Sequence, residues 1–183
     1  MINTNNSHGI PITKKELKAM LLLKLSTLQY DLIKVPEEAR RYLLDIRKTR
    51  NDKNTAMDAY AEDNSPVKVT DLSGLPKREC DMTGEMIDFS EGFDRYILSI
   101  EKEYAAAKKR RSEAIRLLTM VMSLKQPYSR ILYLRYYRKM SPENACYEMH
   151  VARSTMFRKQ NVALDKLAEM FAANYGYIIK PDK

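Results

Sequence analysis

The chain has 183 residues, of which 44% are hydrophobic and 31% are charged, enough for one or two helical domains with their own cores. Its longest uninterrupted apolar run, residues 19–23, is far too short to span a membrane. The two cysteines, Cys80 and Cys146, are far apart and form no CxxC pair. These features exclude a membrane-spanning protein and a disulfide framework, and they favour a cytoplasmic protein.

Positive charge is concentrated in the second part of the chain. Residues 1–104 contain 16 Lys and Arg against 18 Asp and Glu, a net charge of −2, whereas residues 105–183 contain 16 against 6, a net charge of +10. Lys and Arg that displace counterions from phosphates produce such an excess in nucleic-acid-binding domains. The alternative is solvated charge that only keeps the protein soluble.

The first half of the chain is predicted to be helical. Residues 1–12 are polar and are expected to form a disordered leader, followed by an N-terminal helical region at 13–61. Thr13 with Glu16 has the capping-box spacing, and five leucines then recur at helical intervals. Val35-Pro36 interrupts the helix, because proline disfavours helix in the residue before it. The leucines are Leu17, Leu21, Leu25, Leu28 and Leu32.

The middle of the chain contains a boundary and then a long helix. Residues 62–84 are rich in proline, glycine and serine and are expected to be a linker or crossover. Residues 85–125 are expected to form one helix, either a coiled coil with a second chain or part of an ordinary bundle. The apolar stripe of this helix is predicted to be Met86, Phe89, Phe93, Tyr96, Ile100, Tyr104 and Ala107, continued by Arg111, Ile115, Leu118 and Met122.

Two short helices joined by a tight turn are predicted near the C-terminus. Ser141 can cap the first helix, and Pro142 suits the first helical position because its missing N–H costs nothing there. The second helix begins near Arg153 and is polar and basic on one side. A short helix, a turn and a basic helix are typical of proteins that read the major groove of DNA.

Four segments in this region resemble the region-4 helix-turn-helix of bacterial sigma factors: ILYLRY at 131–136, SPENA at 141–145, VARSTM at 151–156 and ALDKL at 163–167. They are also similar to sigma-like phage and prophage regulators, namely the ArpU-type autolysin regulators and the late-gene activators. Three residues depart from the family pattern. Ala152 replaces a capping Ser or Thr, Lys159 replaces an apolar residue, and Phe157 replaces a polar or basic one.

The resemblance implies an all-α protein whose N-terminal long helices, as a bundle or coiled coil, precede a helix-turn-helix domain at 112–173 and a tail at 174–183. It implies a sequence-specific transcription regulator that binds double-stranded DNA, from a phage or prophage, in the bacterial cytoplasm or nucleoid. RNA polymerase and a second copy, held through the N-terminal or long helices, are the further candidate partners. The expected base-reading residues are Arg153, Ser154, Phe157, Arg158 and Asn161, and the expected phosphate contacts are Arg135, Arg138, Lys139, Ser141, Thr155 and Lys159.

The sequence contains no pattern for catalysis or cofactor binding. There is no Walker loop, GxGxxG, HExxH or GxSxG, and the two histidines, His8 and His150, lie far apart. We therefore expect no enzyme, metal site or cofactor. Two alternatives to a transcription regulator remain. One is a phage DNA-packaging or recombination adaptor, and the other is a coiled-coil interaction protein that does not bind DNA.

Overall fold

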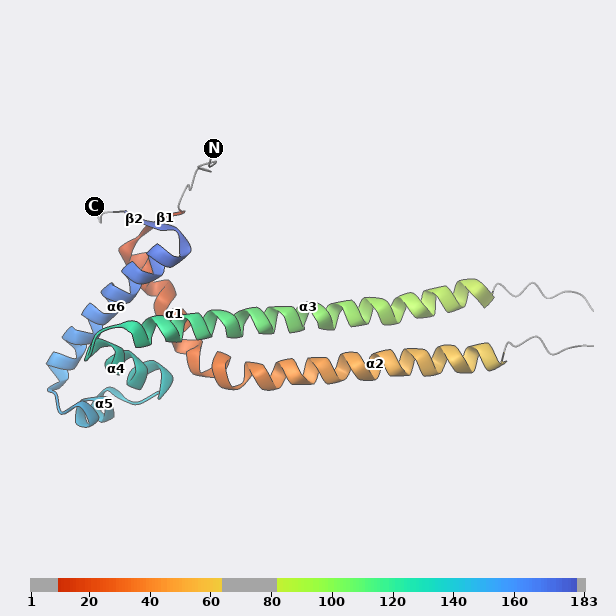
Figure 1. Cartoon of the computed structure of the whole chain (residues 1–183), viewed down its shortest axis with the longest axis horizontal. Coiled ribbons are helices and arrows are strands. Elements are labelled where there is room, and N and C mark those ends of the chain that lie inside the picture. The colour runs from red at the N-terminus through yellow and green to blue at the C-terminus, as the bar shows by residue number, and fades with distance from the viewer. Residues whose placement is uncertain (1–9, 64–81, 181–183) are drawn as a thin grey trace, which may run out of the picture. The chain divides into compact units, whose positions relative to one another are not determined.

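The computed structural model describes residues 10–63 and 82–180, and within these ranges the protein is all-α apart from one short pair of strands (Figure 1). This confirms the predicted fold class and the long N-terminal helices. The predicted leader up to residue 9 and most of the predicted linker at 62–84 lie outside the described residues. None of the described helices is both long and apolar enough to cross a membrane.

The described elements, in chain order, are β1 Ile10–Thr13, α1 Lys14–Ile33, α2 Val35–Asp63, α3 Met82–Ser123, α4 Tyr128–Leu132, the π-helical turn η1 Tyr133–Tyr137, α5 Pro142–Met149, α6 Arg153–Tyr175 and β2 Tyr177–Lys180.

The chain divides into two compact units. The terminal unit combines Met1–Pro36 with Lys109–Lys183, and the two-helix unit is Glu37–Lys108. The sequence had suggested one N-terminal helical region at 13–61. Instead α1 packs in the terminal unit and α2 belongs to the other. The long helix α3 contributes to both units, because the boundary near Lys109 lies within it.

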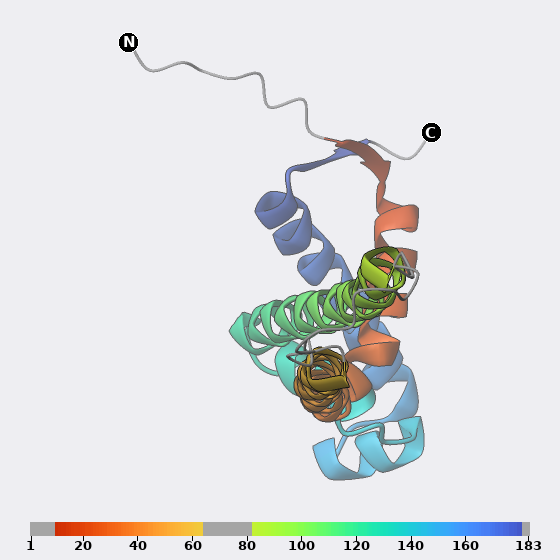
Figure 2. The same cartoon turned by 90° about the vertical axis from the view of Figure 1, so that its right-hand side faces the viewer.

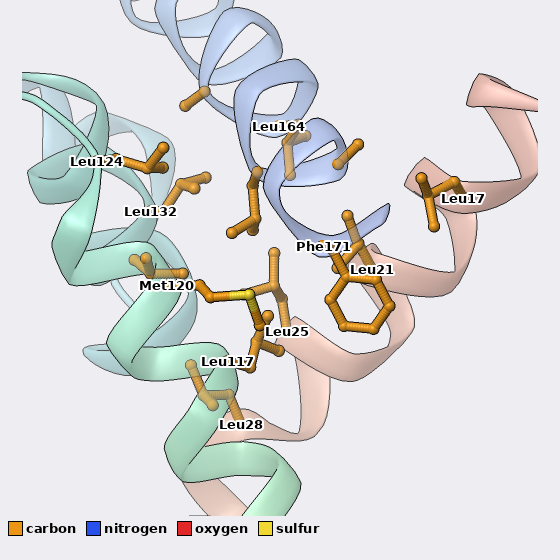
Figure 3. Packing of buried hydrophobic residues seen from close by; sticks show 14 of the residues in the cluster. Leu17, Leu21, Leu25, Leu28, Leu117, Met120, Leu124, Leu132, Leu164 and Phe171 are labelled. Atoms are coloured by element: carbon orange, nitrogen blue, oxygen red, sulfur yellow. The ribbon is translucent and has the colours of Figure 1, made fainter. Parts of the chain in front are cut away.

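The core of the terminal unit is built on the leucine stripe of α1. Leu17, Leu21, Leu25 and Leu28 are almost completely buried, as the 3- and 4-residue spacing predicts (Figure 3). The capping box of α1 is also present, because the backbone N–H of Glu16 donates to the Thr13 hydroxyl over 3.3 Å. The other buried members of this core are Ala114, Leu117, Met120, Val121, Leu124, Leu132, Ala163, Leu164, Leu167, Ala168, Phe171 and Ala172.

A strand pair and an ion-pair cluster join α1 to the C-terminal part of the chain. β1 lies beside β2 (Figures 1 and 2), and the two strands are parallel with Ile10 opposite Tyr177. β2 falls within the segment predicted as a tail, and β1 falls within the predicted leader except for Thr13, which also caps α1 as predicted. Asp165 on α6 pairs with Lys18 at 2.6 Å and with Lys14 at 3.0 Å. The N-terminal helix is therefore fixed to α6 by polar as well as apolar contacts.

The two-helix unit has a much thinner core. α2 and α3 run antiparallel, since Arg50 pairs with Glu101 at 2.8 Å while Lys53 pairs with Asp94 at 2.7 Å. The buried cluster between them consists of Ile46, Ile97 and Ile100, with Tyr42 packed against it. Among the described residues, this buried cluster extends over fewer than two turns of either helix.

The predicted apolar stripe of the long helix is wrong in part. Phe89, Tyr96, Ile115 and Met122 are all exposed, although the stripe had placed them inside. A helix as rich in apolar residues as α3 offers several alternating 3- and 4-residue series, and spacing alone does not select one of them. The series that is buried in the structure runs through Ile97, Ile100, Ala107, Ala114, Leu117, Val121 and Leu124.

Candidate nucleic-acid interface

The two helices predicted at residues 141–167 are present as α5 and α6. Ser141 caps α5, because its hydroxyl accepts a hydrogen bond from the Asn144 backbone N–H at 3.2 Å, and Pro142 occupies the first turn. His150 ends α5 in the left-handed conformation, with φ of 53° and ψ of 44°. This reversal turns the chain within three residues, so that α6 begins at Arg153, the predicted position.

The N-terminus of α6 lacks a side-chain cap. Ala152 has the extended backbone of a capping residue, with φ of −64° and ψ of 148°, but its methyl group can accept no hydrogen bond. The first backbone N–H groups of α6 therefore receive no side-chain acceptor from the capping position. Such groups are suitable donors to the phosphate of a nucleic acid.

The inner face of α6 holds the helix in place. Met156 and Ala163 are completely buried, and on α5 Ala145 is too. Gln160 donates a hydrogen bond from its amide to the Tyr136 hydroxyl over 3.1 Å, which links α6 to η1. Burial raises the pKa of Tyr136 above its ordinary value, although the hydrogen bond from Gln160 opposes this shift. Apolar and polar contacts thus fix the rotation of α6 about its axis.

That rotation turns the five predicted base-reading residues outward. All five are exposed and belong to the first three turns of α6. They follow the helical spacing of one face, since residues three and four apart lie side by side on a helix. The structure therefore brings the whole predicted set together on one surface, which we call the outer face of α6: Arg153, Ser154, Phe157, Arg158 and Asn161.

Arg153 makes two contacts at the start of this face. Its guanidinium lies 3.4 Å from the Glu143 carboxylate of α5 and 5.7 Å from the centre of the Phe157 ring. The pKa of Glu143 is lowered, mainly because its own backbone N–H at the start of α5 donates to the carboxylate, and also because Arg153 is near. Glu143 was not among the site residues that the sequence predicted. An acidic residue in the first turn of α5 is the signal that could have identified it.

The predicted phosphate contacts are in more varied surroundings. Arg138 is exposed, and Thr155 and Lys159 are half-buried beside the outer face. By contrast, Arg135 donates to the Met140 backbone carbonyl and Lys139 donates to the Ser26 carbonyl. The Ser141 hydroxyl already caps α5. Three of the six residues therefore have structural contacts within the terminal unit as well.

The described residues offer no alternative site for metal chemistry. Within residues 10–63 and 82–180, no group of three or more His, Cys, Asp and Glu side chains is close enough to hold a metal ion. Cys146 is a half-buried free thiol on α5. Of the two predicted sets of DNA-contacting residues, the base-reading set is the one whose side chains lie together on one surface, the outer face of α6.

Comparison with known proteins gives one family. The model of DUF1492, described as a protein of unknown function, matches residues 76–168, half of the chain, and the chain belongs to this family. The matched region covers α3, α4, η1, α5 and most of α6, and it stops short of the end of α6. No curated protein and no solved structure matches the chain significantly.

Proposed function

We propose that this member of the DUF1492 family is a sequence-specific regulator of transcription that binds double-stranded DNA, with α6 in the major groove. The observation that carries the proposal is the division of α6 into two faces. Met156 and Ala163 are buried against the rest of the terminal unit, while the outer face presents two arginines, a serine, an asparagine and a phenylalanine. A helix held this way after a tight turn is the arrangement that helix-turn-helix proteins use.

The side chains of the outer face match the chemistry of base edges. Arg153 and Arg158 are the candidates for guanine, because a guanidinium can donate two hydrogen bonds to the guanine O6 and N7. Asn161 can pair with adenine in the same way, Ser154 can contact any base, and the Phe157 ring can pack against a thymine methyl group. Glu143 holds Arg153 at 3.4 Å, so this ion pair would have to open before Arg153 could reach a base.

Phosphate contacts would orient the module without reading the sequence. Arg138, Thr155 and Lys159 are the first candidates. Arg135, Lys139 and Ser141 follow them, because each already makes a hydrogen bond within the terminal unit. The net charge of +10 over residues 105–183 supports such contacts.

One helix-turn-helix makes few base contacts, and such modules act in pairs or beside a larger DNA-binding assembly. We propose a second copy of the chain, bound through the long helices, as one additional partner and RNA polymerase as another. The proposed setting is the bacterial cytoplasm or nucleoid, with a phage or prophage origin. We propose no catalytic role.

The test is selection from a pool of random duplex DNA, with the wild type beside the double variant Arg153→Ala/Arg158→Ala at two salt concentrations. The matched control is Arg47→Ala/Lys48→Ala, which removes the same charge from exposed positions on α2. We expect one sequence to be enriched by the wild type and the control but not by the α6 variant. The loss should be about 1–3 kcal/mol for each base contact removed.

Other outcomes would favour the alternatives. Salt-sensitive binding without sequence enrichment, equal in all three proteins, would leave only a basic surface and favour a packaging or recombination adaptor. An absence of DNA affinity at moderate salt would favour a coiled-coil interaction protein instead.

A further inference from the structure

An aromatic surface on α3, in the two-helix unit, is not covered by any other described part of the chain. Phe89 is 49% exposed and Tyr96 is 57% exposed, and the Phe93 ring packs edge-on against Phe89 with the ring centres 5.0 Å apart. Together with Asp88 and Gly92 they line a shallow hollow of about 340 Å³. We call this the Gly92 surface. Aromatic residues are enriched at protein interfaces, so these adjacent, half-exposed rings favour an interaction site.

Gly92 is not explained by the packing of the described residues. A β-carbon added at Gly92 would meet nothing within 4 Å among them. Glycine inside a helix nevertheless costs about 0.5–1 kcal/mol relative to alanine. The advantage of glycine is that, without a side chain, it lets the backbone of another segment approach closely. The missing side chain therefore suits the approach of something from outside this unit.

The residues around Gly92 are arranged so that the surface can pair with itself. Phe89 and Tyr96 flank the glycine on one side, and Asp88 and Arg95 flank it on the other, as helical spacing requires. Consider two copies of α3 that cross at Gly92 in antiparallel directions and are related by a two-fold axis. The axis places the aromatic side of one helix next to the aromatic side of the other, and the charged side next to the charged side. Phe89 then meets the second copy's Tyr96, and Asp88 meets the second copy's Arg95.

We infer that the Gly92 surface binds the same surface of a second copy of this chain, with the two α3 helices antiparallel. Aromatic side chains then meet aromatic ones and carboxylates meet guanidinium groups, twice in each pair, as an isologous two-fold contact requires. A parallel pair would instead set the charged side of one helix against the aromatic side of the other. The inference specifies the second-copy partner of the proposed function, and it does not depend on DNA binding.

The expected association is weak. The surface extends over about two and a half turns of a single helix and is smaller than a standard protein interface, and contacts of this size form transient complexes. Dimerisation should therefore depend on concentration. The thin core between α2 and α3, in which Ile46, Ile97 and Ile100 are buried, is consistent with a unit that gains stability from a second copy.

The test is sedimentation velocity of the full chain across a range of concentrations, with Asp88→Arg and Arg95→Asp measured separately and then mixed. Each single variant places like charges against each other in both symmetric contacts, and we expect self-association to weaken by roughly tenfold. In an equimolar mixture, each contact between the two variants again joins an arginine to an aspartate: the two introduced side chains meet in one contact and the two native ones in the other. The mixture should therefore dimerise again. Mixing could not restore a contact within one chain.

Gly92→Ala separates this role from a merely structural one. The added methyl group should raise the hydrogen-exchange protection of α3, since alanine is the better helix former, yet weaken dimerisation because it stands at the crossing point. A wild type that stays monomeric at all concentrations would overturn the inference. So would a dimer that neither charge reversal weakens, since it would use another surface. DNA selection on the same variants reports separately on the proposed function.

Discussion

The two units of this protein are both helical, yet they are stabilised in different ways. The terminal unit buries side chains from α1, α3, α4 and α6 in one continuous core and adds the Asp165 ion pairs and a strand pair. The two-helix unit has a buried cluster of three isoleucines, and its other contacts between α2 and α3 include exposed ion pairs such as Arg50 with Glu101. Exposed ion pairs contribute little to stability, so burial decides the difference.

The difference between the two units indicates that the terminal unit is the better support for side chains that must be held in fixed positions. The candidate DNA-reading face is on α6, which the larger core holds in position through Met156, Ala163 and neighbouring residues. A reading surface needs such support, because small displacements of its side chains lose hydrogen bonds. The two-helix unit has no core of comparable size among the described residues, and its exposed aromatic side chains, Phe89 and Tyr96, suit association more than positioning.

Matched core truncations should produce the largest difference between the units. Leu25→Ala removes a completely buried side chain, and we expect the global free energy of unfolding to fall by about 2–5 kcal/mol. Ile97→Ala should leave global unfolding close to that of the wild type and lower hydrogen-exchange protection only in α2 and the adjacent part of α3. Urea unfolding combined with native-state hydrogen exchange measures both. Equal global losses would mean that the two units unfold as one.

A new cap on α6 should stabilise the terminal unit alone. Ala152 occupies the capping position with the correct backbone conformation but has no acceptor, so Ala152→Ser should raise the free energy of unfolding by about 1 kcal/mol. Protection should rise in α6 and stay unchanged in α2. Ala152→Val, which also lacks an acceptor, is the control and should not stabilise. An equal gain with valine would rule out capping as the cause.

The contribution of Asp165 should disappear in acid. Burial disfavours its ionised form, but hydrogen bonds from Lys18 and Lys14 outweigh this effect and lower the pKa below the ordinary value of 3.8. The stabilisation is therefore fully present above pH 3.8, the ordinary value, and is lost as the pH falls through the lower folded-state pKa. Thermal unfolding of wild type and Asp165→Asn should differ at pH 7 and converge in strong acid. A difference that persists there would implicate packing instead of charge.

The smallest expected effect concerns Glu143. Glu143→Gln removes the carboxylate that holds Arg153 at 3.4 Å, and we expect DNA affinity to rise by a few-fold, in the range of an exposed ion pair. Glu148→Gln removes the same charge from α5 without releasing Arg153 and serves as the control. The gain should vanish in an Arg153→Ala background. A gain of the same size from both glutamate variants would indicate only a general effect of charge.

Local signals in the sequence predicted the terminal unit well. Ser141, Pro142 and the turn before Arg153 identified α5 and α6 because caps and turns depend on neighbouring residues. The apolar residues of the predicted helix-turn-helix domain also predict twelve core positions for it. In the structure Met149 and Val151 are half-buried and the other ten are buried. Those others are Leu117, Val121, Ile131, Leu132, Leu134, Ala145, Met156, Ala163, Leu164 and Leu167.

Features that depend on distant partners could not be predicted. The pairing of β1 with β2 joins residues near opposite ends of the chain, and four-residue strands have no local pattern to identify them. The exposure of Phe89 and Tyr96 depends on which face of α3 meets α2, and Ile97, one residue from Tyr96, was the better core residue. The contact between Glu143 and Arg153 likewise exists only once the turn has formed.

The placement of α1 has a consequence for synthesis of the protein on the ribosome. Its apolar stripe, Leu17 to Leu28, packs against residues 114–172, which are made much later. About 140 residues separate Leu28 from Phe171, and at ~5–20 residues per second their translation takes roughly 7–28 s. Until the end of that interval the leucines lack part of their native partners, because the core residues of α6 come last. The nascent chain should therefore be a client of chaperones that bind exposed apolar helices, until α6 emerges and closes the core.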